Sequence, residues 1–448
     1  MLYRSTADPA HRATFREAVL RGTPPPSASG AAGLYVPETP PALPPGFADT
    51  LAERSLDEVA VALARACIGP DDVSDADLAD AVRHTLAFPL PVVDVEPGLS
   101  LLELFHGPTL AFKDVGARFL AAMLGLFART DGRETVVLVA TSGDTGGAVA
   151  AGLHGTPGVS VVVLYPEGRV SALQEKQFAA LGGNVHALRV AGSFDDCQRL
   201  AKAMFADAGL REAVALTSAN SISVARLVPQ TFYYGALAQH TAQTGGPAPA
   251  VVVPSGNVGN LTAGLLARRA GLPLGRFVAA TNANALLPDV LGGMPYTPRA
   301  SHRTLSTAMD VGDPSNLARL LDLYGSPAAL ARYVEAVSVS DAETEAAMRG
   351  LFERTGTVID PPTAVGVAAW ARVQRPAERP GKRPGKPERG VVLATAHPAK
   401  FPDEVRRVLG SVPETPERLA RLADRPTLSE DLAPDAGALR AWLAARFG

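Results

Sequence analysis

The chain has very few cysteines, with Cys67 and Cys197 the only two among its 448 residues. Two cysteines exclude a disulfide framework and any cysteine-rich metal site. No apolar run is long enough to span a bilayer, and the first residues lack the apolar segment of a signal peptide. We therefore expect a cytoplasmic protein with no membrane partner.

An excess of charge of either sign is absent as well. The 42 Lys and Arg residues nearly balance the 45 Asp and Glu residues, which leaves a net charge of −3. No overall field therefore favours nucleic acid. With 47% hydrophobic residues, the composition is that of a globular protein long enough for two or three domains.

The familiar nucleotide-binding and hydrolase motifs are also missing. The sequence has no Walker A loop, no Gly-x-Gly-x-x-Gly and no Gly-x-Ser-x-Gly. No two of the eight histidines lie within five residues of each other, so a helical pair of metal ligands is absent. We expect no bound metal.

The first region, to about residue 95, combines a connector with helices. Residues 23–46 contain eight prolines, which predicts an irregular surface segment because proline fixes φ and removes a donor. Helical periodicity follows at 55–67 and 75–88. Ser55 and Glu58 fit a capping box at the start of the first of these helices.

From about residue 96, apolar strands alternate with helices. Strands are predicted at 135–140, 159–165, 184–190, 250–253, 276–281 and 391–395, and helices at 172–181, 195–207 and 261–269. Continuous apolar strands alternating with helices indicate an α/β fold with a parallel sheet covered on both faces. Ligands of such sheets bind at the carboxyl ends of the strands.

Lys113 stands in an apolar, turn-flanked segment, directly after Ala111-Phe112. Such a lysine can lie at a loop-to-helix junction with its head in solvent. Alternatively, burial favours the neutral amine, which forms a Schiff base with an aldehyde cofactor. The segment alone favours the first interpretation.

Two glycine-rich loops favour the second interpretation of Lys113, the Schiff base. Residues 141–146 and 255–260 each follow a predicted strand and precede a helix, where backbone amides favour phosphate. A tight strand-to-helix turn is the alternative for each loop. Together with a lysine that can form a Schiff base, two phosphate-type loops predict pyridoxal phosphate.

Polar residues at two other strand ends complete the candidate site. Thr395 ends a strand, and its hydroxyl is placed to meet the ring nitrogen of the cofactor. For His397 two interpretations remain: it is a functional residue of the site, or it is a polar residue that closes the end of the strand. Asn220, Ser221 and Arg226 precede a helix, where Arg226 suits phosphate or carboxylate, with an ordinary surface arginine as the alternative.

Residues 375–390 are rich in basic residues and proline. We expect a solvated surface loop, since a buried strand follows; contact with a polyanion is the alternative.

In these motifs the chain resembles threonine synthase, of the longer subclass of bacteria and fungi. The resemblance covers nearly the whole length and rests on residues 33–38, 106–114, 140–146, 173–176, 218–226, 254–259, 279–282 and 395–401. It implies the tryptophan-synthase-β-like (fold type II) pyridoxal-phosphate fold, with two parallel-sheet αβα subdomains and an N-terminal subdomain. It also implies conversion of O-phospho-L-homoserine and water to L-threonine and phosphate.

The resemblance also implies roles for single residues. Lys113 would carry the cofactor and shuttle protons, Thr395 would face the ring nitrogen, and Asp144 would lie beside the phenolic oxygen of the cofactor. The expected phosphate cup of the cofactor is Gly256, Asn257, Val258, Gly259 and Asn260. The substrate phosphate is expected to meet some of Ser142, Thr145, Asn220, Ser221 and Arg226.

We expect an N-terminal subdomain at 1–95, a catalytic core at 96–410 with a smaller subdomain at about 115–225, and a helical segment at 411–448. Pro362 replaces a histidine that many relatives carry, and we expect its segment to be structural. The segments at 23–46 and 375–390 look like surface insertions.

Three alternatives remain open from the sequence. A threonine or serine dehydratase, or a related phospholyase, would use the same cofactor. A binding protein on the same fold would lack catalysis, and a nucleic-acid role would depend on residues 375–390. We expect a monomer or homodimer acting on a small molecule without nucleic acid.

Overall fold

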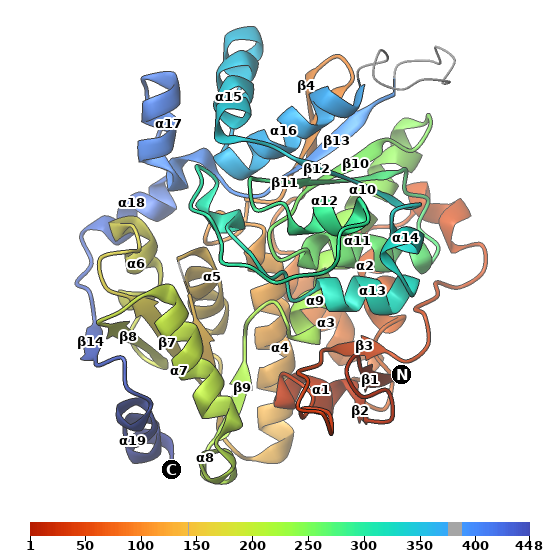
Figure 1. The fold of residues 1–448 in the computed structure, drawn as a ribbon. Coiled ribbons are helices and arrows are strands. Elements are labelled where there is room, and N and C mark those ends of the chain that lie inside the picture. The colour runs from red at the N-terminus through yellow and green to blue at the C-terminus, as the bar shows by residue number, and fades with distance from the viewer. Residues whose placement is uncertain (142, 375–387) are drawn as a thin grey trace.

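The computed structural model describes residues 1–141, 143–374 and 388–448. Two parallel sheets lie on either side of the long helix α4 (Lys113–Asp131), and a small antiparallel sheet lies beside the N-terminus (Figure 1). Among the described helices, none is long and apolar enough to cross a membrane.

The larger sheet has six strands in the order β12-β11-β10-β13-β5-β4, parallel except for the β4–β5 pair. Their bounds are β4 (Val92–Glu96), β5 (Leu99–Glu103), β10 (Ala250–Pro254), β11 (Phe277–Thr281), β12 (Val334–Ser338) and β13 (Gly390–Ala394). Alternate residues of a strand enter different cores: Val251 and Val253 pack in one cluster, and Val252 packs in another. The sheet is therefore covered on both faces, as the apolar strands predict.

Helices from distant parts of the chain cover these two faces. On one side lie α15 (Asp341–Thr355), α16 (Pro361–Gln374) and α17 (Pro402–Leu409), and on the other lie α10 (Thr231–Thr244) and α11 (Gly259–Arg269) (Figure 1). Shorter elements connect them: α9 (Val224–Leu227), η2 (Val228–Gln230), α12 (Leu286–Leu291), η3 (Thr307–Met309), α13 (Leu317–Tyr324), α14 (Pro327–Leu330) and η5 (Pro398–Lys400).

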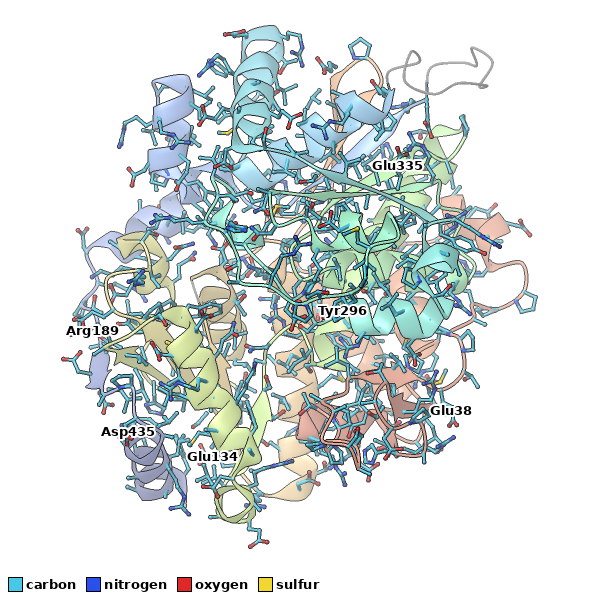
Figure 2. The ribbon with its side chains drawn as sticks, viewed as in Figure 1. Glu38, Glu134, Arg189, Tyr296, Glu335 and Asp435 are labelled. Carbon is cyan, nitrogen blue, oxygen red and sulfur yellow. The ribbon has the colours of Figure 1, made fainter. Side chains whose placement is uncertain are left out.

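The smaller sheet is entirely parallel, in the order β14-β8-β7-β6-β9. Its strands are β6 (Thr135–Ala140), β7 (Val159–Pro166), β8 (Val185–Val190), β9 (Ala215–Ser218) and β14 (Ser429–Leu432), and its helices are α5 (Asp144–Leu153), α6 (Ala172–Ala179), α7 (Phe194–Ala206), α8 (Ala208–Ala213) and α19 (Ala436–Phe447). Arg189 on β8 and Asp435 at the start of α19 mark its outer side (Figure 2).

The last residues of the chain differ from the helical segment that we predicted. Residues 411–448 hold α18 (Glu417–Ala423) and α19, but β14 between them pairs in parallel with β8. The sequence of β14 carries polar and charged residues because the strand lies at the sheet edge, so it lacks the apolar run that marked the other strands.

The N-terminal region forms the antiparallel sheet β2-β1-β3 and four helices. The bounds are β1 (Leu2–Ser5), β2 (Arg12–Thr14), α1 (Phe15–Arg21), β3 (Tyr35–Pro37), η1 (Phe47–Glu53), α2 (Leu56–Arg65) and α3 (Asp75–Thr85). The capping box of Ser55 and Glu58 is present at the start of α2, as predicted.

The proline-rich connector at 23–46 is only partly the surface segment that we predicted. Its residues Leu34, Tyr35 and Val36 are buried, and β3 pairs with β1. The expectation was wrong there because this short apolar run completes the small sheet. Of the basic loop predicted at 375–390, residues 375–387 lie outside the described residues.

Candidate functional site

The candidate site begins where the chain leaves β5 and reaches α4 along the carboxyl end of β13. The amide of Leu104 donates to the carbonyl of Ala394 at 3.0 Å, and the amide of Phe112 donates to that of Thr395 at 2.8 Å. Lys113 is the next residue and the first of α4. Lys113 and Thr395 are thereby held at the same end of the larger sheet. Thr395 was predicted at a strand end, whereas β5, which leads to Lys113, was not among the predicted strands.

A buried carboxylate fixes the shape of this loop. Asp114 accepts hydrogen bonds from the amide of Thr109 at 2.9 Å and from the Thr109 hydroxyl at 2.5 Å. A Cβ on Gly107 would lie 2.5 Å from Asp114 Oδ2, so only glycine fits there. Leu110 has a φ of 57°, which is strained for a leucine and requires support of this kind.

Lys113 is the least satisfied cation of the site. In the described part of the chain its Nζ makes no hydrogen bond or ion pair, and it lies 5.7 Å from the ring centre of Phe112. Burial lowers the pKa of Lys113 to about 8, Asp144 opposes that shift, and Lys400 and Arg226 add to it. The amine is therefore partly neutral near physiological pH, as a nucleophile toward an aldehyde must be.

Lys400 is a site residue that sequence reasoning missed. Its Nζ lies 2.7 Å from Asp144 Oδ1 and 2.9 Å from the carbonyl of Thr109, and the two side chains of the pair are 1% and 6% exposed. Burial alone would raise the pKa of Asp144, but Lys400 and Lys113 lower it to about 2. The sequence does contain a hint of this role. Lys400 lies between Ala399 and Phe401, and Lys113 likewise follows an alanine and a phenylalanine, so both lysines have apolar neighbours.

The loop at 141–146 opens α5 and delivers Asp144. The Thr141 hydroxyl accepts hydrogen bonds from the amides of Gly143 at 3.0 Å and Gly146 at 2.8 Å. Thr145 is half-buried in the first turn of α5, and within the described residues its side chain makes no hydrogen bond. Ser142, predicted as a substrate ligand, lies outside the described residues.

The second glycine loop has the features of an anion cradle. The first bond of α11 runs from Thr262 N to Val258 O, and in the described chain the amides of residues 256–261 donate to no acceptor. Val258 has a φ of 49°, a strained value that is typical of ligand-binding loops. A Cβ on Gly256 would lie 2.9 Å from Met309 Cα, so glycine is required where the two segments meet.

The predicted phosphate residues around 220 adjoin this cradle. The Asn257 side chain donates to the Ser221 hydroxyl at 2.5 Å and accepts the amide of Ser315 at 2.6 Å. Arg226 is buried and donates to the carbonyl of Ala219 at 2.6 Å. Burial lowers the pKa of Arg226 to about 10, and among the described residues it has no carboxylate partner.

Unpartnered buried atoms show that this region fits a phosphorylated cofactor and an anionic substrate. The described residues leave five such atoms here: Asn220 Oδ1, Ser223 Oγ, Arg226 Nε, Asn260 Nδ2 and, beside Gly259, Asn316 Nδ2. Buried polar atoms normally find a partner, and four of these five can donate to an anion. Together with the amides of 256–261 and the amine of Lys113, they match the phosphate and aldehyde of pyridoxal phosphate.

The two remaining predicted residues have different surroundings. Thr395 is buried, and its hydroxyl lies 3.3 Å from Oδ2 of Asp360. His397 Nδ1 accepts the amide of Ala399 at 3.1 Å, and its ring stacks edge-on against Phe105. Of the two interpretations of His397, the geometry supports closing the strand end.

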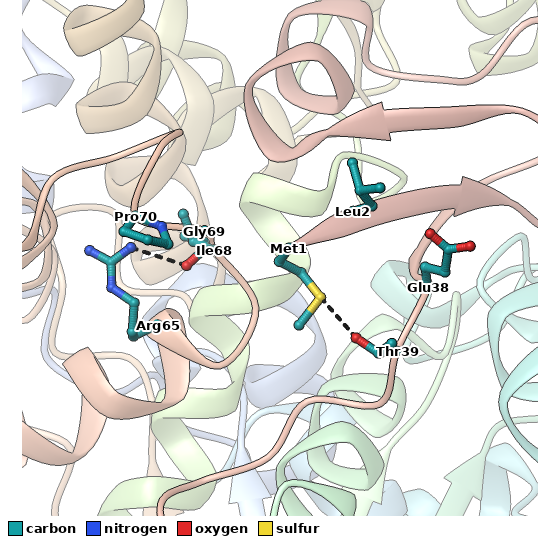
Figure 3. A pocket seen from close by; sticks show the side chains of 8 residues that line it. All are labelled: Met1, Leu2, Glu38, Thr39, Arg65, Ile68, Gly69 and Pro70. Carbon is teal, nitrogen blue, oxygen red and sulfur yellow. Dashed lines mark hydrogen bonds between the residues drawn. The ribbon is translucent and has the colours of Figure 1, made fainter.

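A surface hollow of about 360 Å³ lies elsewhere, beside the N-terminus, between Met1, Arg65 and Gly69 (Figure 3). The two terminal nitrogens of Arg65 are already held by the carbonyls of Ile68 and Val73 and by Asp75, which leaves Nε as its one donor without a partner among the described residues. Within the described chain no group of His, Cys, Asp or Glu is arranged to hold a metal ion.

The fold and this site define a class of protein, the pyridoxal-phosphate-dependent enzymes of fold type II. The sequence matches the family of pyridoxal-phosphate-dependent enzymes over residues 78–384. It also matches the threonine synthase N-terminus over residues 2–86 and the threonine synthase C-terminal region over residues 363–443.

The chain belongs to the threonine synthase family, and its cofactor is pyridoxal phosphate. It is 41% identical to threonine synthase of Escherichia coli over 434 residues, 97% of each chain. The crystal structure of the Escherichia coli enzyme aligns with a TM-score of 0.88 over 99% of this chain and 100% of that one, at 39% identity. Threonine synthase of Brucella melitensis, solved with the cofactor bound, aligns with a TM-score of 0.88 over 100% and 99%, at 33% identity. The activity of this chain is that of a threonine synthase, a pyridoxal-phosphate-dependent lyase.

Proposed function

We propose that Lys113 holds the cofactor covalently and that the residues around it turn O-phospho-L-homoserine and water into L-threonine and phosphate. The observation that carries the proposal is the amine of Lys113, half-buried, without a hydrogen bond in the described chain and with its pKa lowered to about 8. When bound, pyridoxal phosphate withdraws electrons from the α-carbon of the substrate. Lys113 Nζ accepts and returns protons at the α- and β-carbons.

The loop at 256–260 holds the phosphate of the cofactor. Its support is the run of free amides at the start of α11, where backbone dipoles favour negative charge. Gly256, Asn257, Val258, Gly259 and Asn260 make this cup. Thr395, beside the residue that precedes Lys113, faces the ring nitrogen, and Asp144 faces the phenolic oxygen.

Departing phosphate is a dianion, and Arg226 supplies the opposite charge. Its support is a buried guanidinium with an unpartnered Nε and no carboxylate partner in the described chain. Some of Ser142, Thr145, Asn220 and Ser221 bind the same phosphate. This group binds the substrate through its phosphate and stabilises the charge that appears as phosphate leaves.

The chain divides into residues 1–95, a catalytic core at 96–410 that contains the smaller subdomain at about 115–225, and residues 411–448, whose β14 and α19 complete that smaller subdomain. The near balance of charges supports a protein that works without nucleic acid. It acts in the cytoplasm on a small-molecule substrate, as a monomer or homodimer.

Product analysis with O-phospho-L-homoserine tests the function. The expected products are L-threonine and inorganic phosphate in equal amounts. A dehydratase or phospholyase would give 2-oxobutyrate instead, and a binding protein without catalysis would give neither. Formation of 2-oxobutyrate as the main product would overturn the proposal.

A further inference from the structure

A third buried carboxyl group, that of Asp360, is hydrogen-bonded to Thr395. Asp360, at the start of α16, is 1% exposed. The Thr395 hydroxyl donates to its Oδ2 at 3.3 Å, and the Thr363 hydroxyl donates to its Oδ1. The amide of Thr395 in turn donates to the Thr363 hydroxyl at 3.2 Å. Asp360, Thr363 and Thr395 thus form one buried hydrogen-bonded group.

No cation balances this carboxyl group in the described chain. Strands β10, β11 and β13, against which α16 packs, carry no charged residue within their bounds. Arg372 on α16 is bonded to the Ser338 carbonyl and to Glu343 of α15. At the same sheet end, Lys400 is paired with Asp144, and among the described residues Lys113 makes no hydrogen bond or ion pair with Asp360.

Burial raises the pKa of Asp360 to about 7, although its hydrogen bonds from Thr363 and Thr395 oppose the shift. Asp360 therefore holds a proton in some molecules and lacks one in others at neutral pH. Burying a carboxyl group without a cation costs free energy, and carboxyl groups with shifted pKa values of this kind cluster at functional sites.

The single proton of the Thr395 hydroxyl links Asp360 to the ligand side of the strand end. When Thr395 donates to ionised Asp360, its oxygen offers lone pairs to the ring nitrogen, which must then carry the proton. When Asp360 holds a proton and donates it to Thr395, the hydroxyl donates to an unprotonated ring nitrogen. The two arrangements contain the same number of protons: one moves from the ring nitrogen to Thr395 as the threonine proton moves to Asp360.

We propose that Asp360 is a positioning residue that controls, through the Thr395 hydroxyl, whether the ring nitrogen of the bound cofactor carries a proton. This inference rests on the proposed function, in which Thr395 faces that nitrogen. The segment at 359–366, expected from sequence to be only structural, acquires a role in tuning the cofactor.

The experiment measures the protonation state of the ring nitrogen directly. Holoenzyme is reconstituted with ¹⁵N-labelled pyridoxal phosphate, and the ¹⁵N chemical shift is measured at neutral pH in the wild type, Asp360→Asn, Thr395→Val and the double variant. In Asp360→Asn the amide group donates to Thr395, so we expect the ratio of protonated to unprotonated ring nitrogen to fall by roughly tenfold or more, which corresponds to one pKa unit. In the Thr395→Val background, Asp360→Asn should produce no further change.

Thr363→Val provides a second route if Asp360→Asn fails to bind the cofactor. It keeps Asp360 but removes one donor to the carboxylate, which raises the pKa of Asp360 and shifts the proton away from the ring nitrogen. A ring-nitrogen shift that stays at the wild-type value in Asp360→Asn, or in Thr363→Val when the first variant cannot be measured, overturns the inference. Failure of the wild type to attach the cofactor at Lys113, seen by mass spectrometry after reduction, would overturn the proposed function instead.

Discussion

Lys400 Nζ lies 2.7 Å from Oδ1 of Asp144, and both side chains are almost completely buried. Both members of the pair act on the pKa of Lys113: Asp144 raises it, and Lys400 lowers it. A buried pair next to a reactive amine sets the charge of that amine as well as contributing to stability. Several consequences can be measured.

The amine of Lys113 should be indispensable. Lys113→Ala removes the proposed covalent link and the proton carrier, so we expect no visible absorbance of lysine-bound cofactor and a loss of turnover of about 10³-fold or more. Absorbance spectra and threonine formation measure these. Lys202→Ala, on an exposed lysine of α7, is the matched control and should leave both unchanged. A Lys113→Ala variant that kept both signals would contradict the assignment.

Capture of the cofactor by apoenzyme should follow the titration of Lys113. Because its pKa is lowered to about 8, the rate of capture should rise with pH through a midpoint near pH 8 and level off about one pH unit higher. Lys400→Met removes a nearby positive charge and should move the midpoint up, whereas Asp144→Asn removes a negative charge and should move it down. Stopped-flow absorbance measures the midpoints; a shift in the same direction for both variants would refute this electrostatic account.

How much of the site was predictable depends on where each signal lies in the sequence. Thr395 and both glycine loops lie at the ends of predicted strands, and parallel strands bring their carboxyl ends together. Lys113 was marked only by its apolar setting, because β5, the strand that leads to it, was not predicted. The contacts of Lys400 were not predictable, because Thr109 and Asp144 lie far from it in the chain and no periodicity encodes the approach. The same holds for Asp360, whose importance depends on the hydroxyl of Thr395. Edge strand β14 escaped prediction because its polar residues resemble a loop.

Breaking the Lys400–Asp144 pair should destabilise the fold. Lys400→Met leaves a buried carboxylate without its partner, and we expect a loss of about 3–5 kcal/mol in the free energy of unfolding. The double variant Lys400→Met/Asp144→Asn should lose clearly less, because no unpaired charge remains. Urea unfolding at neutral pH measures both, and equal losses in the single and double variants would argue against the pair.

The same pair predicts the acid limit of stability. The pKa of Asp144 is lowered from its ordinary 3.8 to about 2 in the folded protein. Its contribution is therefore complete above about pH 4 and is lost as the pH falls toward 2. Unfolding free energies of the wild type should fall over this interval, and those of Lys400→Met/Asp144→Asn should fall less steeply. Parallel curves for the two proteins would contradict this contribution.

Gly256 should tolerate no side chain. A Cβ there would lie 2.9 Å from Met309 Cα and 3.1 Å from its carbonyl oxygen, whereas a Cβ on Gly259 would meet only the Asn316 side chain, at 3.3 Å. Gly256→Ala must displace backbone, which costs about 1–3 kcal/mol, so the cofactor affinity should fall roughly tenfold to a hundredfold. Gly259→Ala is the matched control within the same loop, because a flexible side chain can yield. Equal affinities in the two variants, measured by titration of apoenzyme, would show that this contact does not shape the cradle.

Arg226 should act on the substrate phosphate rather than on the fold. Its side chain is buried, and the one hydrogen bond that its guanidinium makes to the described protein goes to the Ala219 carbonyl. Replacing such an uncompensated charge by an apolar side chain is close to neutral for stability, so Arg226→Met should change the free energy of unfolding by about 1 kcal/mol or less. Loss of a charged hydrogen bond to phosphate should raise KM by roughly tenfold to a hundredfold, and inhibition by inorganic phosphate should weaken in parallel.

Arg226→Lys keeps the charge without the guanidinium geometry and should recover part of the affinity. Arg189→Met, which breaks a surface pair with Asp431, should alter neither quantity. If the Arg226→Met enzyme stays folded and both its KM and its inhibition by phosphate are unchanged, Arg226 does not bind the substrate phosphate.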